Sequence, residues 1–252
     1  MTLIQNGGGS MRLMIEMKGR DSERVAVPIN YRPLIHGMIY HMLADFGDYA
    51  ANQHAARTTG GRTYKGFTFS PLLGSYQVEG YTIIFTGAIT LEIRSIDPVM
   101  TAFLYHSILS KGEIRIGDVP LTVTHCTLEE KHIREREARI RMVSPVVVYS
   151  TDETNYCHFF SPADEEFYSL IYGNAKRKGA FFQLLSPFEL SLSLAPGYRP
   201  KKQVSNFKHT ILEGWYGEFL IKGSPEYIDM LYKTGLGAKN TEGFGMFEII
   251  TE

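Results

Sequence analysis

Eight histidines supply the side chains best suited to proton transfer near neutral pH, because an unperturbed imidazole has a pKa of about 6.5. His36 and His41 are five residues apart in a segment with helical spacing, about 140° around the helix axis, so they do not share a face. No His-Glu-x-x-His spacing occurs, and the other histidines are scattered. We therefore expect no metal site and no cofactor. The lack of a Gly-x-Ser-x-Gly turn argues against a serine hydrolase.

Four glycines fall within residues 235–245, as Gly235-Leu236-Gly237, five residues, and Gly243-Phe244-Gly245. Glycine tolerates positive φ and lets a backbone approach a ligand or another chain closely. Exposed N–H groups in such a loop can form a concave anion site, and Lys239 adds positive charge. The simpler interpretation is a glycine that ends a helix, followed by a tight turn into a last strand. The spacing alone leaves both open.

Three basic clusters are candidates for contacts to phosphate. The run 131–141 alternates basic and acidic residues and is better explained as a solvated charged face. The other two have few acidic neighbours that would cancel attraction to phosphate. One is expected just after a helix and the other in a loop rich in glycine and proline; they comprise Lys176, Arg177 and Lys178, and Arg199, Lys201, Lys202 and Lys208.

Composition describes a globular chain of one large or two ordinary domains, with 252 residues, 44% hydrophobic and 21% charged. The net charge of −1 gives no global signal for nucleic acid, although a local basic face is sufficient. Cys126 and Cys157 lack paired spacing, which favours a reducing cytosol. No apolar run approaches the roughly 18 residues of a membrane span, so we expect a cytoplasmic protein without a membrane partner. Residues 1–10 are expected to be a leader or an added extension.

Periodicity predicts the order strand, helix, strand, strand, helix, strand in each half of the chain. In the first half, the strands are expected at 11–17, 67–73, 81–92 and 121–128, with helices over about 34–46 and from Asp97-Pro98. In the second half, strands are expected at 140–149, 188–194, within 209–221 and at 244–250, with helices from Ser161-Pro162 and Ser224-Pro225. The sequence therefore predicts an α+β protein of two tandem ferredoxin-like (RRM-like) βαββαβ domains, 11–130 and 131–252.

The glycine loop 235–245, between a last helix and a last strand, resembles the signature loop of the RAMP superfamily of RNA-binding proteins found in CRISPR systems. Within that superfamily, the chain is most similar to the endoribonucleases that cut the precursor repeat transcript into guide RNAs. The stretch Val27-Pro28-Ile29-Asn30-Tyr31, followed by Gly37-Met38-Ile39-Tyr40, matches the family's first helix. The similarity covers residues 11–252 and is strongest at this helix and at the glycine loop.

The resemblance implies three catalytic residues: Tyr40 on the helix, His54 as general acid and base, and Lys65 just before the second strand. It implies metal-independent cleavage, in which the RNA 2′-OH attacks the adjacent phosphorus and leaves 2′,3′-cyclic phosphate and 5′-hydroxyl ends. The histidine transfers a proton, the lysine stabilises charge on the phosphoryl oxygens, and the tyrosine orients the 2′-OH. Family members do not all share one catalytic set, so His36 and His41 stay open as alternatives to His54.

CRISPR repeat RNA is the partner that the resemblance implies. Two alternatives stay open: a non-catalytic RNA-binding subunit of a CRISPR interference complex, and a ferredoxin-like protein with no RNA role. The sequence does not say whether the repeat is hairpin or unstructured, or whether the protein forms a homodimer. The residues expected to bind RNA are Gly235, Gly237, Lys239, Gly243 and Gly245 of the loop, with Lys176, Arg177, Lys178, Arg199, Lys201 and Lys202.

Overall fold

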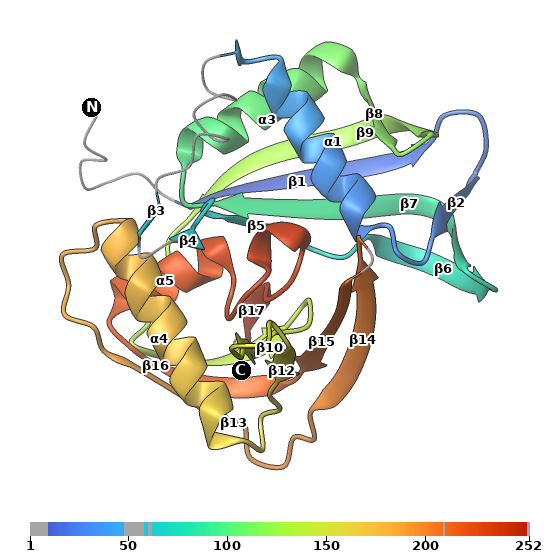
Figure 1. Ribbon diagram of the computed structural model, residues 1–252. Coiled ribbons are helices and arrows are strands. Elements are labelled where there is room, and N and C mark those ends of the chain that lie inside the picture. Colours follow the sequence, from blue (N-terminus) through green and yellow to red (C-terminus); the bar gives the residue numbers. More distant parts are fainter. Residues whose placement is uncertain (1–9, 48–57, 60–61, 209, 251–252) are drawn as a thin grey trace. The chain divides into compact units, whose positions relative to one another are not determined.

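A computed structural model describes residues 10–47, 58–59, 62–208 and 210–250 (Figure 1). The chain divides into two compact units. The first unit combines Met1–Ala55 and Leu72–His132, and the second unit combines Ala56–Pro71 and Ile133–Glu252. A short segment of the first half of the chain thus belongs to the unit that the second half builds. Among the helices in the described ranges, none has both the length and the apolar character needed to cross a membrane.

The first unit is a β-sheet with two helices. Its sheet runs in the order β2-β7-β1-β9-β8, with β6 also paired to β7, and these pairings are antiparallel. Helix α3 packs against β1, β7 and β9, and α1 packs against α3 and β8 (Figure 1). The elements are β1 (Ser10–Gly19), β2 (Arg24–Pro28), α1 (Arg32–Ala44), β6 (Leu73–Glu79), β7 (Thr82–Ser95), α3 (Pro98–Lys111), β8 (Glu113–Ile116) and β9 (Val119–Lys131).

The second unit repeats this plan. Its sheet runs in the order β13-β16-β10-β17, again antiparallel, and α5 packs against β16 and α4. Two hairpins, β11–β12 and β14–β15, are inserted into it. The elements are β3 (Thr58–Thr59), β4 (Arg62–Thr63), β5 (Phe67–Phe69), β10 (Glu137–Met142), β11 (Tyr149–Thr151), β12 (Cys157–Phe159), α4 (Glu165–Phe181), β13 (Leu190–Leu194), β14 (Lys201–Phe207), β15 (Thr210–Tyr216), β16 (Glu218–Gly223), α5 (Pro225–Thr234) and β17 (Phe247–Ile250).

Each unit has the chain order of a ferredoxin-like fold. In the first unit β1, α1, β6, β7, α3 and β9 give βαββαβ, and in the second β10, α4, β13, β16, α5 and β17 give the same order. The predicted fold class, α+β with two tandem ferredoxin-like domains, is confirmed.

Helix α1 forms as the sequence predicts. Pro33 occupies its first turn, where a missing N–H costs nothing. The apolar side chains recur at helical spacing and face the interior, whereas His41 is exposed and His36 and Tyr40 are half-buried. The His36 and Tyr40 rings lie 4.7 Å apart, centroid to centroid. The buried apolar residues are Ile35, Met38, Ile39, Met42 and Leu43.

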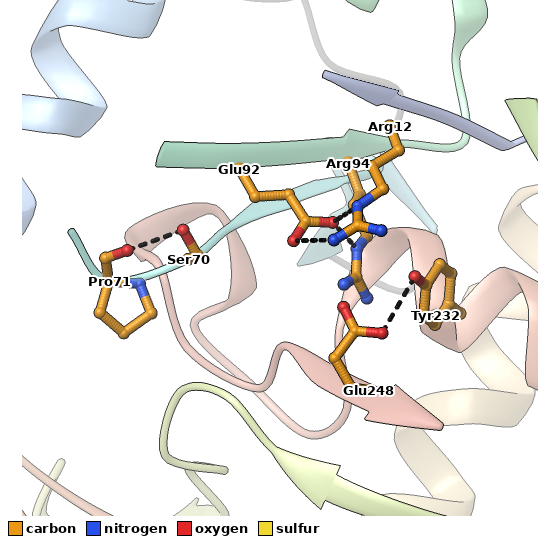
Figure 2. A network of polar contacts seen from close by, with 7 residues as sticks. All are labelled: Arg12, Ser70, Pro71, Glu92, Arg94, Tyr232 and Glu248. Carbon is orange, nitrogen blue, oxygen red and sulfur yellow. Dashed lines mark hydrogen bonds and ion pairs between the residues drawn. The ribbon is translucent and has the colours of Figure 1, made fainter. Parts of the chain in front are cut away.

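A buried ion cluster joins β1 to β7 in the first unit (Figure 2). Arg12 Nε and Arg94 Nε lie 2.6 and 2.5 Å from Glu92 Oε1. Glu92 is 3% exposed and Arg94 is fully buried. Burial alone would raise the pKa of Glu92, but the guanidinium groups of Arg94 and Arg12 hold it below its ordinary value. The carboxylate therefore stays ionised, and removing either arginine would leave part of a buried charge uncompensated.

Two predicted strands differ from the structure. The predicted strand 67–73 is only the short β5, Phe67–Phe69, and a separate strand that was not predicted, β6, follows over Leu73–Glu79 with all its residues exposed. A strand without a buried face has no alternation of apolar residues to detect. The predicted strand 140–149 ends at Met142, because the buried Val146 and Val147 form isolated bridges to Trp215 and Ala238 instead.

Two further local differences lie in the second unit. The single strand expected within 209–221 is two strands, β15 and β16. Helix α4 begins at Glu165 rather than at Ser161, because Asp164 is the N-cap. Asp164 Oδ2 accepts hydrogen bonds from the backbone N–H and the hydroxyl of Ser161, at 2.7 and 2.8 Å, which holds the preceding turn outside the helix.

Candidate functional site

The glycine loop, residues 235–245, connects α5 to β17 and contains a 3₁₀ turn over Asn240–Glu242. Its four glycines have φ between 71 and 85°, the left-handed region that favours glycine. The protein's own atoms fill the space beside them. A Cβ on Gly237 would lie 2.6 Å from the backbone oxygen of Val147, and one on Gly243 would overlap the ring of Phe69. Packing within the second unit therefore requires these glycines.

Six backbone N–H groups of the loop donate to oxygens of the protein itself, so these six are not available for the concave anion site that the sequence left open. Lys239 Nζ lies 3.2 Å from Glu242 Oε1, so this lysine has an acidic partner within the loop. The six donors are Gly235, Leu236, Ala238, Glu242, Gly243 and Gly245, which donate to the backbone oxygens of Leu231, Gly245, Val147, Lys239, Asn240 and Pro145 in that order.

Asn240 is the centre of the loop's polar contacts. Its Nδ2 donates to the backbone oxygens of Leu236 and Phe244, both at 3.1 Å. Its Oδ1 accepts a hydrogen bond of 2.7 Å from Lys178 Nζ, which also donates to the backbone oxygen of Gly235 at 2.7 Å. One amide side chain thus joins both ends of the loop to each other and to Lys178.

Lys178 belongs to α4 and is 3% exposed. The prediction that Lys176, Arg177 and Lys178 follow the helix is therefore wrong. All three lie within α4, where Lys176 and Arg177 are exposed and Lys178 turns inward. Burial lowers the pKa of Lys178 to about 7.

A Lys178→Met variant tests how this lysine holds the loop. The substitution leaves two acceptors without their donor, and we expect it to lower the free energy of unfolding by roughly 1–3 kcal/mol. The wild-type lysine is neutral in the folded protein above about pH 7 but charged in the unfolded chain up to its ordinary pKa of 10.5. Raising the pH from 7 to 9 should therefore stabilise wild type relative to Lys178→Met.

Chemical denaturation at pH 7 and pH 9 measures this difference, with the exposed Lys176→Met on the same helix as control. The control should follow wild type at both pH values. Parallel pH profiles for wild type and Lys178→Met would contradict a lowered pKa.

A pocket of about 380 Å³ lies within the second unit, beside the glycine loop. Residues 64–67, residues 238–242 of the loop, and Asn174 and Lys178 of α4 line it, together with residues of β11. Lys65 is half-buried here, and burial, followed by the nearby positive charge of Lys208, lowers its pKa. A site that places ammonium groups near one another favours an anion, because a negative charge relieves their repulsion.

The predicted catalytic residues lie in different parts of the chain. Lys65 lines the pocket of the second unit, Tyr40 is on α1 of the first unit, and His54 lies outside the described residues. Burial raises the pKa of Tyr40 to about 12, so the phenol keeps its proton at neutral pH and can donate a hydrogen bond. Within the described ranges, no three histidine, cysteine or acidic side chains are grouped as they would be to hold a metal ion.

The second predicted cluster lies on the β14–β15 hairpin. Lys201 and Lys202 belong to β14 rather than to a loop, and Arg199 precedes the strand. All three are exposed, and Lys202 Nζ lies 2.7 Å from Glu213 Oε2. Arg199 and Lys201 therefore present their charge to solvent more fully than Lys202 does.

The alternating run near the start of the second unit has partners of its own. Arg139 and Arg141 of β10 lie 2.7 and 2.8 Å from the carboxylate of Glu218 on the neighbouring strand β16. This pairing agrees with the interpretation of the run as a charged face rather than a phosphate contact.

Sequence reasoning missed Asn240, Asn174 and Glu242, which all line the pocket. A signal for Asn240 was present, because an asparagine between two Gly-x-Gly pairs can bond backbone groups in a turn. No sequence signal points to Asn174, because it lines the pocket only through the packing of the glycine loop beside α4.

Comparison with known proteins agrees with this architecture. Residues 128–249 match the family model for CRISPR associated protein Cas6, C-terminal. A CRISPR-associated endoribonuclease Cas6 of Methanocaldococcus jannaschii is 25% identical over 246 residues, covering 94% of this chain and 92% of that protein.

Solved structures share the fold. A CRISPR associated protein Cas6 superposes with a TM-score of 0.76 at 22% identity, covering 96% of this chain and 100% of that one. The product of a Cas6-related gene from Pyrococcus furiosus gives 0.81 at 21% identity, covering 97% and 100%. An RAMP protein described as binding different RNA substrates gives 0.79 at 18% identity, covering 96% and 100%.

Two tandem ferredoxin-like units are the fold that this chain shares with these Cas6 and RAMP structures. Its residues 128–249 match the family model for CRISPR associated protein Cas6, C-terminal, and nearly its whole length is similar to Cas6 proteins.

Proposed function

We propose that this chain is a metal-independent endoribonuclease that cuts CRISPR repeat RNA. A protein named as a CRISPR-associated endoribonuclease is similar to this chain over 94% of the chain's length, which supports RNA cleavage. The observation that carries the proposal is the position of Lys65, which lines a pocket beside the glycine loop together with Lys239. Such a pocket suits a phosphate of the RNA backbone.

The proposed reaction is an internal transesterification. The 2′-OH attacks the adjacent phosphorus, a bond forms between phosphorus and O2′, and the bond to O5′ breaks. The 2′ proton passes to a base, and O5′ receives a proton as it leaves, so the products are a 2′,3′-cyclic phosphate and a 5′-hydroxyl. In this proposal His54 transfers protons, the Lys65 ammonium stabilises the phosphoryl oxygens, and the protonated Tyr40 donates a hydrogen bond that orients the sugar.

RNA docking in this proposal uses the exposed cations. Lys176 and Arg177 on α4, and Arg199 and Lys201 at the β14–β15 hairpin, are exposed and suited to phosphate contacts. Lys239 contributes from the loop itself. The loop glycines and Lys178 act by shaping the loop, because the protein's own atoms occupy the space around them.

Repeat RNA incubated with the protein in EDTA tests the proposal. We expect cleavage at one position with a 2′,3′-cyclic phosphate on the upstream product, and no cleavage when the upstream nucleotide is 2′-deoxy. Cleavage that stops in EDTA and returns with Mg²⁺, or that tolerates the deoxy substitution, would contradict the mechanism. Tight binding without cleavage would favour the alternative, a non-catalytic RNA-binding subunit of an interference complex.

A further inference from the structure

The strand β6, Leu73–Glu79, has one edge without a partner strand in the described part of the chain. It pairs with β7 and is the outermost strand on that side of the first unit's sheet (Figure 1). All seven of its residues are exposed. A free strand edge presents N–H and C=O groups, to which a second strand can add by regular hydrogen bonds.

The opposite edge of β7 shows how its backbone groups alternate. The backbone oxygen of Tyr81, just before β7, accepts a hydrogen bond of 2.8 Å from the N–H of Ile29, so residue 81 faces β2. The next residue, Thr82, lies opposite Pro28 of β2, which has no N–H to exchange. Because successive residues of a strand direct their N–H and C=O groups to opposite edges, residues 82, 84 and 86 face β6.

The register of β6 then determines which of its groups reach the free edge. Glu79, Gln77 and Ser75 lie opposite residues 82, 84 and 86, so their backbone groups bond within the sheet. Tyr76 and Val78, between them, present their N–H and C=O groups outward. Their side chains share one face of the sheet and are 59% and 54% exposed. The free edge thus combines outward backbone groups with apolar side chains.

Three other edge strands carry features that discourage pairing with a further strand. Strand β2 ends in Pro28, and β8 has only four residues, two of them charged. On β13, the hydroxyl of Tyr172 accepts from the N–H of Leu192 at 2.9 Å and donates to its backbone oxygen at 3.1 Å. Proline, charge, short length and covering groups are the usual protections of sheet edges. Strand β6 has a single charged residue, Glu79, at its end.

The sequence of β6 is complementary to itself in one antiparallel register. If Gln77 of two copies lies on a twofold axis, Tyr76 of each copy is opposite Val78 of the other, and each of these pairs exchanges two backbone hydrogen bonds. An aromatic residue opposite a β-branched one is a favourable cross-strand pair. On the other face, the two Gln77 amides can donate to and accept from each other, and Ser75 can donate to Glu79 of the other copy.

We propose that two copies of this chain associate through β6, with Gln77 on the twofold axis, so that two first-unit sheets become one continuous sheet. The occupant is a second copy because one register matches the outward backbone groups, the apolar side chains, the amide and the carboxylate with the strand's own sequence. Pairing through one strand forms a small interface, which predicts a dissociation constant of roughly 1–100 μM. The inference does not depend on the proposed nuclease function.

Sedimentation of the full chain over a range of concentrations tests the association. We expect wild type to change from monomer to dimer within the predicted range. Gln77→Lys places two ammonium groups opposite each other at the axis and should weaken the dimer roughly tenfold or more. Gln183→Lys, the same substitution at an exposed glutamine of the second unit, should dimerise like wild type. Thermal unfolding checks that both variants are folded.

Disulfide formation tests the register. Opposite residues of a pair that does not exchange hydrogen bonds have Cα atoms about 4.5 Å apart, so Gln77→Cys should form a disulfide-linked dimer under mild oxidation. Ser75→Cys, on the same face of β6, should not, because its two copies would be roughly 14 Å apart along the strands. Wild type, with Cys126 and Cys157, gives the background.

Three results would overturn the proposal. The first is wild type that stays monomeric above the predicted concentration range, which would leave the edge to another protein. The second is a dimer that Gln77→Lys leaves as strong as wild type. The third is a Gln77→Cys variant that forms no more disulfide-linked dimer than Ser75→Cys does.

Discussion

His54→Ala is expected to cleave repeat RNA at least roughly 100-fold more slowly than wild type in single turnovers, the usual contribution of general acid–base catalysis. Affinity for uncleaved RNA should change little, because the histidine acts on the transition state rather than on docking. Rapid-mixing cleavage assays give the rate, and filter binding to RNA with a 2′-deoxy block at the cut gives the affinity.

His125→Ala, an exposed histidine on β9, is the matched control and should cleave normally. Tyr40→Phe and Lys65→Ala should slow cleavage less than His54→Ala. If His54→Ala cleaves at the wild-type rate, His36 becomes the better candidate, since its ring lies 4.7 Å from that of Tyr40, with the exposed His41 next. Silent substitutions at all three histidines would contradict the nuclease proposal.

Gly245→Ala is expected to destabilise the second unit strongly and to abolish tight RNA binding. Its φ of 77° costs a residue with a Cβ about 1–2 kcal/mol. The new Cβ would also overlap the backbone oxygen of Leu236 and lie 2.6 Å from Asn240 Nδ2, which adds roughly 1–3 kcal/mol of overpacking. Because Asn240 joins the loop to Lys178, a displacement of Asn240 should also change the pocket beside the glycine loop. Chemical denaturation and filter binding measure the two losses.

Gly112→Ala separates the backbone cost from the overlap. Gly112 ends α3 with a φ of 65°, and nothing lies within 4 Å of the position its Cβ would take. It should therefore lose only the backbone part and keep its RNA affinity. Equal effects of the two substitutions would show that packing around Gly245 is unimportant.

Local signals predicted much of the fold from the sequence. Asp97-Pro98 and Ser224-Pro225 marked helix starts correctly, and Asp97 Oδ1 accepts from the N–H of Val99 at 2.9 Å, as an N-cap does. The apolar spacing along α1 gave the buried face. These features depend on neighbours within a few residues, which a single sequence displays directly.

Features that depend on distant partners could not be predicted. Lysine is usually a surface residue. Lys178 is buried here because Gly235 and Asn240, which are far along the chain, supply acceptors for its ammonium group. In the candidate site, the position of Lys65 beside the glycine loop likewise depends on tertiary packing, which the spacing of residues in the sequence does not predict. The roles of Tyr40, His54 and the exposed cations stay predictions.

The membership of residues 62–71 in the second unit has a consequence for synthesis. Thr68 Oγ1 donates to the backbone oxygen of Phe244 at 3.3 Å, and Phe69 packs against Gly243, so this segment needs the last residues of the chain. At about 5–20 residues per second, a ribosome takes roughly 10–40 s to make the remaining chain. The nascent segment must wait for that time without its partners. A fragment expressed from residue 133 onward would lack Lys65 and one wall of the pocket, and adding a peptide of residues 58–71 in trans should restore both.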